Sequence, residues 1–141
     1  MSAQLQQVEH LHWQHRVQPG AVAAWGEIVT GIADIEQSIQ IICLTPKLSV
    51  PTEPDKFCDA LNYIDRPAPV AIPRITREIF DALVQHEPRI VVDRVEVEAI
   101  GFEHFLVPVF WRPREDVLGE IRRTNIILNR DIAEAQGAPL Q

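Results

Sequence analysis

The sequence predicts an α+β fold in which three helices precede a small antiparallel sheet, with an N-terminal arm outside the folded body. A change of hydrophobic pattern carries this prediction. Apolar residues recur every three or four positions up to residue 86, whereas residues from 90 onward are β-branched and roughly alternating. The change falls at Glu87-Pro88-Arg89, where Pro88 fixes a corner because it cannot continue a helical hydrogen-bond pattern.

Length and composition bound the class of protein. With 141 residues, 46% of them hydrophobic, the chain can form one domain whose core needs no metal or disulfide. The 13 basic and 20 acidic residues give a formal charge of -7, which argues against a general nucleic-acid binder because phosphate attraction needs net or clustered positive charge. The arginines of the C-terminal third are interleaved with acids, and we interpret them as a solvated mixed-charge surface: Arg112, Arg114, Arg122, Arg123 and Arg130.

The sequence shows no targeting or membrane-spanning segment. Its first 18 residues are polar and His-rich, and no apolar run is long enough to cross a bilayer. Cys43 and Cys58 fall on the apolar faces of expected helices, so we interpret them as buried free thiols in a reducing compartment. We therefore expect the protein to be made and folded in the cytosol.

The expected organisation is an arm and lead-in over residues 1–25, a folded domain over residues 26–130 and a tail over residues 131–141. Residues 3–16 have the apolar spacing of a helix, but a Pro-Gly pair ends that pattern before the next element begins. This segment is therefore expected to lie outside the main fold.

The first two helices are expected on either side of a proline-containing loop. The first covers residues 32–43, where four isoleucines form one apolar stripe. The second begins at Pro54-Asp55, which supply a rigid first turn and an early negative charge. The apolar residues that the second helix is expected to bury are Phe57, Leu61 and Ile64.

The third helix is expected over residues 74–86. Three prolines between residues 65 and 73 should keep the preceding segment extended. On the outer face of the helix, Arg77 and Asp81 are spaced to form an ion pair across one turn.

Three strands are expected after the corner, over residues 90–99, 104–112 and 120–128. Short turns join them, which favours an antiparallel meander, and Gly101 suits the first turn. Pro108 conflicts with a central strand because it lacks the N–H that a ladder requires, so a bulge or local edge is expected there.

Several short motifs occur in a fixed order between residues 26 and 97. They are Gly26-Glu27-Ile28-Val29 with Gly31, Ile35 with Gln37-Ser38-Ile39, Thr45-Pro46-Lys47, Pro54-Asp55, Tyr63-Ile64-Asp65 and Glu87-Pro88-Arg89. In this order and spacing they make the chain resemble the baseplate wedge family of contractile phage tails. That family includes the W protein of P2-like phages, its counterparts in Mu-like phages and the TssE component of type VI secretion systems. The loop over residues 47–56 departs most from the family pattern.

The resemblance implies a virion structural protein in the inner ring of the baseplate wedge. Its implied partners are the larger wedge proteins around the tube, the tail sheath and possible tube proteins, in a hetero-oligomeric assembly without nucleic acid or membrane insertion. The family's fold resembles the interlocking domain of the sheath, so a strand edge could receive the first sheath ring and initiate sheath assembly. The implied location is the tail baseplate, assembled in the host bacterial cytoplasm. The alternative is a baseplate component of a type VI or related contractile injection system.

Glu87, Pro88 and Arg89 are predicted partner-binding residues, because the resemblance implies that this corner contacts a helical bundle of larger wedge proteins. From the residues alone, the two charges could equally form a local salt bridge that braces the corner and contributes little when exposed. Both roles can hold together.

Two tryptophans are also predicted to bind partners. Trp13 and Trp25 lie in the arm and lead-in, where a large apolar ring without a local core suggests docking on a neighbour. Trp111, in contrast, is in phase with the apolar residues of the middle strand and is expected in the core.

No catalytic residue is predicted, although members of the family are sometimes labelled lysozyme-like. Glycoside hydrolysis needs two carboxylates about 5–10 Å apart across a cleft. The candidate carboxylates fall on polar helix faces: Glu36, Asp59, Glu78 and Asp81. The sequence also has no Gly-rich phosphate loop and no nucleophile elbow. We expect a protein that is not an enzyme, with a cell-wall hydrolase as the alternative of a different class.

No cofactor or metal is expected either. His10, His12 and His15 are close in sequence, and imidazoles at such spacing can share an ion. They lie on no single helical face and have only Glu9 nearby as a carboxylate. We therefore expect no residue of this chain to be a metal ligand.

Overall fold

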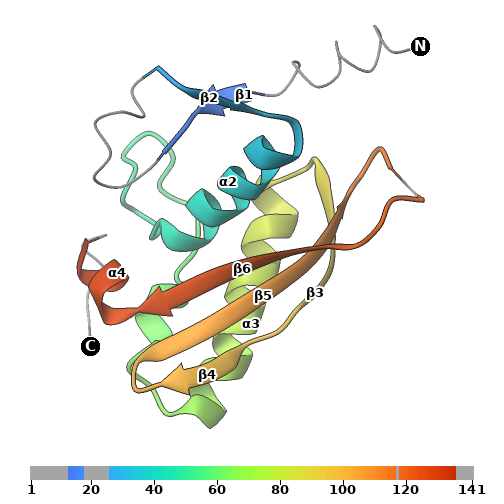
Figure 1. The fold of residues 1–141 in the computed structure, drawn as a ribbon. Helices are drawn as coiled ribbons and strands as arrows, with labels where there is room; N and C mark the ends of the chain where they lie inside the picture. The colour runs from blue at the N-terminus through green and yellow to red at the C-terminus, as the bar shows by residue number, and fades with distance from the viewer. Residues whose placement is uncertain (1–12, 18–25, 117, 136–141) are drawn as a thin grey trace, which may run out of the picture. The chain divides into compact units, whose positions relative to one another are not determined.

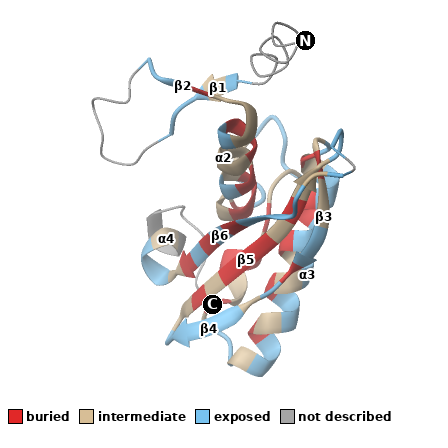
Figure 2. Cartoon of the chain, turned by 45° about the vertical axis from the view of Figure 1, so that its right-hand side comes forward, coloured by how far each residue is buried: buried red, intermediate tan, exposed pale blue. Residues whose placement is uncertain are grey.

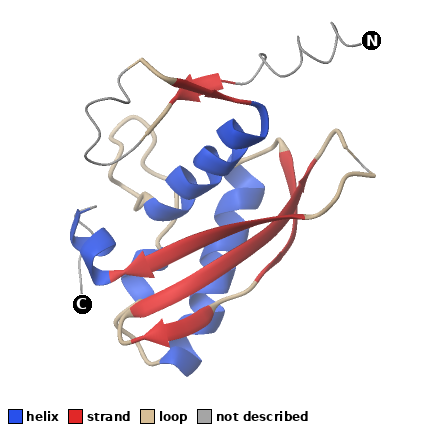
Figure 3. Ribbon diagram, in the orientation of Figure 1, coloured by secondary structure: helices blue, strands red, loops and turns tan. Residues whose placement is uncertain are grey.

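The computed structural model describes residues 13–17, 26–116 and 118–135, and it confirms the expected α+β class (Figure 3). The chain separates into two compact units, Met1–Ile39 and Gln40–Gln141, which are described one at a time. The boundaries expected after residues 25 and 130 stay a prediction. None of the helices in the described ranges combines the length and apolar character needed to span a lipid bilayer.

A two-stranded ladder leads into the first helix. Strand β1 (Trp13–His15) pairs antiparallel with β2 (Ile28–Thr30), and helix α2 (Gly31–Leu44) follows at once. Gly31 has a φ of 61°, in the left-handed region that favours glycine, so it turns the chain from strand to helix. The expected helix over residues 32–43 is confirmed.

The helix expected over residues 3–16 is wrong at its end, because residues 13–15 form β1. The ladder to β2 supplies the backbone hydrogen bonds that a helix would have made locally. Two glutamines reinforce this: Gln14 Nε2 donates to the Asp34 carbonyl at 2.8 Å, and Gln37 Nε2 donates to the His15 carbonyl at 2.8 Å. Residues 1–12 lie outside the described ranges.

The second expected helix is also wrong, since only a short 3-10 helix, η2 (Ala60–Tyr63), forms there. Phe57 has a φ of 85°, which no α-helix can include. The backbone bonds across the loop instead, with the Cys58 N–H donating to the Thr45 carbonyl at 3.0 Å. The residues expected to be buried here are Leu61 and Ile64, which are buried, and Phe57, which is half-buried.

Helix α3 (Ala68–His86) begins six residues earlier than expected, so the prediction of an extended segment up to Pro73 is wrong. Pro67 is the N-cap and Pro69 lies in the first turn, where a helix does not need backbone N–H donors. Pro73 lies inside the helix, where its missing N–H removes one backbone hydrogen bond. The burial of the apolar face of the helix offsets this loss of stability. The residues of that face are Ala71, Ile75, Ile79, Ala82 and Leu83.

The second unit is built around a sheet whose central strand is β5 (His104–Pro113). Strand β6 (Arg122–Asn129) pairs with β5 along one edge. Along the other edge, β5 pairs with β3 (Ile90–Val95) and then with β4 (Glu98–Gly101). The first expected strand is therefore two strands, and all pairings are antiparallel (Figure 1).

The break between β3 and β4 explains how Pro108 fits a central strand. The Pro108 carbonyl accepts a hydrogen bond of 3.1 Å from the Glu96 N–H, in the segment that joins the two strands. The carbonyl and the nitrogen of one strand residue point to the same side, so the missing N–H also faces this break. The conflict with a central strand is thus resolved without a lost ladder bond.

Helix α3 packs on one face of this sheet (Figures 1 and 2). The strand side chains on that face are buried: Phe105, Val107, Val109, Trp111, Ile126 and Leu128. Trp111 is therefore a core residue, as expected, and its indole N–H donates to the buried Thr124 hydroxyl at 2.9 Å. This bond satisfies the indole N–H that burial removes from water.

Both cysteines are buried and free, as expected. Burial raises the pKa of the Cys58 thiol to about 12 and raises the pKa of Cys43 well above its usual range.

A short helix, α4 (Arg130–Ala135), follows β6. The Asn129 side chain caps it by accepting a hydrogen bond from the Ile132 N–H at 2.8 Å. The expected tail therefore begins as a helix.

Candidate functional site

The Glu87-Pro88-Arg89 corner joins the end of α3 to the start of β3. The Glu87 N–H donates to the Leu83 carbonyl at 3.0 Å and closes the last helical turn. Glu87 itself has a φ of -123°, outside the helical region, as expected for a residue before proline. The direction of the chain is thus fixed within three residues, and Pro88 lies exposed at the outside of the turn.

A two-point ion pair holds the side chains of this corner. Arg89 Nε lies 2.7 Å from Glu87 Oε1, and Arg89 Nη2 lies 2.9 Å from Glu87 Oε2. The Glu87 side chain is only 3% exposed, whereas that of Arg89 is 25% exposed. The planar guanidinium matches the carboxylate at two points, so the pair fixes the orientation of the arginine as well as neutralising the buried acid.

Arg114, at the end of β5, braces the backbone of the same corner. Its N–H donates to the Arg89 carbonyl at 2.8 Å, and its Nε donates to the Pro88 carbonyl at 2.8 Å. A longer bond of 3.5 Å runs from Nη2 to the Ile90 carbonyl. Three successive carbonyls are therefore held by one residue 24 to 26 positions away in sequence.

The sequence interpretation misses this role of Arg114, because the interleaved charges predict a solvated mixed-charge surface there. The missing information is the strand register, since Ile90 pairs with Pro113 and so brings the next residue to the corner. A basic residue two positions after the expected strand over residues 104–112 is the one sequence signal that could have indicated it.

His86, at the end of α3 next to the corner, has a lowered pKa. Partial burial lowers the pKa of His86, and the charges of Lys56 and Lys47 lower it further, although the charge of Glu53 acts in the opposite direction. Both lysines belong to the loop that departs from the family pattern, so that loop lies close to the C-terminal end of α3. Lys47 also pairs with Glu78 of α3 at 3.8 Å.

Of the two tryptophans predicted to bind partners, the structure describes Trp13, which belongs to the first unit. Trp13 is in β1 and is 57% exposed, with its ring against His15 at a centroid distance of 6.0 Å and an interplanar angle of 86°. Trp25 lies outside the described residues. The exposure of Trp13 is compatible with docking on a neighbour, and this role stays a prediction.

Strand β6 offers a second candidate contact surface. Among the described residues it pairs with β5 alone, so no described strand pairs with its other edge. Asn125 faces Pro108, whose polar groups point to the opposite edge of β5, so this is a pair without mutual hydrogen bonds. The N–H and C=O of Asn125 therefore point away from β5, as do those of Arg123 and Ile127, two residues to either side.

The carboxylates weighed for glycoside hydrolysis are largely engaged in local contacts. Asp59 accepts from the Lys47 N–H at 3.3 Å, Glu78 pairs with Lys47, and Asp81 pairs with Arg77 at 3.6 Å. The Arg77–Asp81 pair was expected and is confirmed. Glu36, the fourth candidate, lies in the part of α2 that belongs to the first unit.

Within the described ranges, no group of three or more His, Cys, Asp and Glu side chains could hold a metal ion. Of the histidines weighed for a metal, His15 lies in β1, and His10 and His12 lie outside the described residues.

Comparison with known proteins identifies a family and a solved structure of similar fold. Residues 29–104, more than half of the chain, match the model of the family described as baseplate wedge protein gp25. A crystal structure from Geobacter sulfurreducens, described as a candidate tail lysozyme, resembles this chain with a TM-score of 0.57 and 24% sequence identity. The match covers 68% of this chain and 87% of that one, and it shows the shared fold. No curated protein matches the chain.

Proposed function

Because the chain belongs to the baseplate wedge protein gp25 family, we propose that it joins neighbouring wedge proteins through the Glu87-Pro88-Arg89 corner. Membership of the family makes it a structural component of the baseplate of a contractile tail, where it assembles with other baseplate proteins. The proposal adds which surface makes the contact and how.

The observation that carries the proposal is the unequal exposure of the two charges. Glu87 is buried and holds the guanidinium at two points, while a quarter of the Arg89 side chain remains accessible. An arginine whose orientation is set before binding loses less conformational freedom when a partner arrives. We therefore assign the partner contact to Arg89 and the positioning role to Glu87.

We further propose that the edge of β6 away from β5 receives a strand from the tail sheath. A row of outward N–H and C=O groups supports this assignment, because an added strand can pair with them without displacing β5. In this proposal the chain lies in the inner ring of the wedge, near the tube, and helps to initiate the sheath. It acts by fixed geometry without catalysis and is assembled in the host cytoplasm.

Assembly in the producing cell tests the corner. Arg89→Ala should leave a folded protein that is not incorporated into baseplates, so few contractile tails form. Arg77→Ala is the matched control, because Arg77 also forms an ion pair with a carboxylate, that of Asp81, but lies exposed on α3. Normal incorporation of Arg89→Ala would contradict the proposal.

A further inference from the structure

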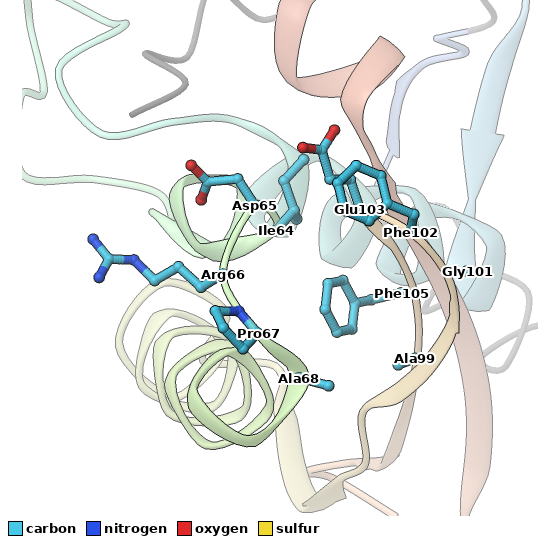
Figure 4. A pocket seen from close by; sticks show the side chains of 10 residues that line it. All are labelled: Ile64, Asp65, Arg66, Pro67, Ala68, Ala99, Gly101, Phe102, Glu103 and Phe105. Atoms are coloured by element: carbon cyan, nitrogen blue, oxygen red, sulfur yellow. The ribbon is translucent and has the colours of Figure 1, made fainter.

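The turn that joins β4 to β5 presents an aromatic side chain to solvent. Gly101 pairs with His104, so Phe102 and Glu103 form a two-residue hairpin loop. Figure 4 shows both loop side chains on one side of a recess. Phe102 is 90% exposed, and Ile100, two residues earlier, is 48% exposed. Single exposed apolar residues are common, whereas two in one short hairpin form a small apolar patch.

The backbone of this loop is strained at the residue next to Phe102. Glu103 has a φ of 51°, in the left-handed region, where hairpin loops favour glycine, asparagine or aspartate because a larger side chain crowds the backbone. The chain has a glutamate at this position and its glycine two positions earlier. Proteins depart from local preference mostly at functional sites, where another gain offsets the strain. The loop therefore combines an exposed aromatic ring with an unfavourable turn residue.

An ion pair ties this loop to the next helix. Glu103 Oε2 lies 3.5 Å from Nη1 of Arg130, the first residue of α4, and the Glu103 side chain is only 16% exposed. The glutamate is thus turned toward the protein, while the phenylalanine next to it is turned toward solvent. Because the loop has two residues and one of them is tied to α4, the fold sets the direction in which Phe102 points. A side chain oriented in this way loses less conformational freedom on binding.

The hairpin that carries Phe102 is acidic. Residues 95–106 contain three glutamates and no lysine or arginine. Glu96 and Glu103 each pair with an arginine outside the hairpin, which partly neutralises them. Glu98 is exposed on β4 and adds to the net charge of -7. A partner that is complementary to this hairpin therefore combines apolar and basic side chains.

We propose that Phe102 inserts into an apolar pocket, bordered by lysine or arginine side chains, on a neighbouring baseplate protein. Burial of the ring supplies the affinity, and a basic side chain at the rim of the pocket faces Glu98. A second copy of this chain is a poorer partner, because its own hairpin carries the same negative charge. The inference uses the membership of the family and not the contact at the corner, so either proposal can fail without the other.

Photo-crosslinking in assembled baseplates tests the proposal before the partner is known. The variant is Phe102→Bpa, where Bpa is the photoreactive residue p-benzoylphenylalanine, and baseplates purified from the producing cell are irradiated. We expect a link to one segment of a different baseplate protein, and that segment should contain lysine or arginine. Leu118→Bpa is the matched control, because Leu118 is 98% exposed in the loop between β5 and β6, and it should not link to that segment. No link from residue 102, a link to a second copy of this chain, a link to a segment without lysine or arginine, or the same link from residue 118 would overturn the proposal.

Competition for incorporation measures the contribution of the ring. When variant and parent are made in equal amounts in one cell, Phe102→Ser should be at least about tenfold rarer than the parent in purified baseplates, because burying a phenylalanine side chain is worth about that factor or more. Leu118→Ser should be incorporated as well as the parent. Both side chains are exposed, so both purified variants should melt at the temperature of the parent. Equal incorporation of Phe102→Ser, or a lower melting temperature that assigns Phe102 to the fold, would overturn the proposal.

Discussion

Arg89 donates two hydrogen bonds to the carboxylate of Glu87, at 2.7 Å and 2.9 Å, across the single proline that separates them. The Glu87 carboxylate is buried, whereas the Arg89 side chain is partly exposed. Glu87 therefore belongs to the interior of the protein, while Arg89 presents a guanidinium of fixed orientation at the surface. This asymmetry is the reason to assign different roles to two charges that the sequence presents as equivalent.

The asymmetry predicts unequal losses of stability. Arg89→Ala leaves the buried Glu87 carboxylate without the two bonds of the guanidinium and should lower the free energy of unfolding by about 3 kcal/mol. Glu87→Ala should cost less, about 2 kcal/mol, because Arg89 can turn toward water. Urea unfolding measures both values. Both variants should stay folded, since domains of this size have about 5–15 kcal/mol of stability. The reverse order of losses would contradict the assignment of Glu87 as the interior residue.

Arg114 is predicted to hold the backbone of the corner. Arg114→Ala should lower the free energy of unfolding by about 1–2 kcal/mol, because it removes two side-chain hydrogen bonds and keeps the backbone one. Hydrogen exchange at Arg89 and Ile90 should become faster. Arg122→Ala, at an exposed position of β6, is the control and should leave exchange at the corner unchanged.

His86 is predicted to make the fold sensitive to acid. Its pKa is lowered in the folded state, so the unfolded chain binds the proton more readily and stability falls as the pH drops below about 6.5. His86→Gln removes this contribution. The stability of the parent protein relative to the variant should be constant above about pH 7.5 and should decrease from pH 7 to pH 5. A relative stability that increased on acidification would mean that the folded state favours protonated His86.

The outward edge of β6 can be tested with proline. Asn125→Pro removes an N–H that points away from β5, so it should cost at most about 1 kcal/mol while blocking strand addition by the sheath. Thr124→Pro is the contrast at a position that faces β5, and it should cost more than about 2 kcal/mol because it loses both a ladder bond and the hydroxyl that accepts from Trp111. Sheath assembly on baseplates that contain Asn125→Pro measures the effect. Normal sheath formation would show that this edge is not used.

Most of the fold follows from hydrophobic periodicity, and its failures lie where prolines or non-local bonds decide. The stripe of isoleucines predicts α2, and the alternation around Trp111 predicts β5. In contrast, the prolines before residue 74 were interpreted as barriers to a helix, although Pro67 and Pro69 occupy the positions where a helix tolerates them. Phe57, with its left-handed backbone, carries no sequence signal of that conformation.

The candidate site divides in the same way. The corner is visible in sequence because Pro88 separates two periodicities, and its charges can be named. The burial of these charges cannot be predicted from the sequence, because it depends on the packing of α3 against the sheet. The contribution of Arg114 cannot be predicted either, since Arg114 reaches the corner only through the pairing of β3 with β5.

The most direct test of the account is the affinity of the purified chain for a wedge subassembly that lacks it. Arg89→Ala should weaken binding at least about 30-fold, as expected for an arginine at the centre of an interface. Glu87→Ala, which loses stability but keeps the arginine, should weaken it less, and Arg77→Ala should bind as the parent protein does. If Arg89→Ala bound within threefold of the parent, or if Glu87→Ala lost more affinity than Arg89→Ala, Arg89 would not be the contact residue.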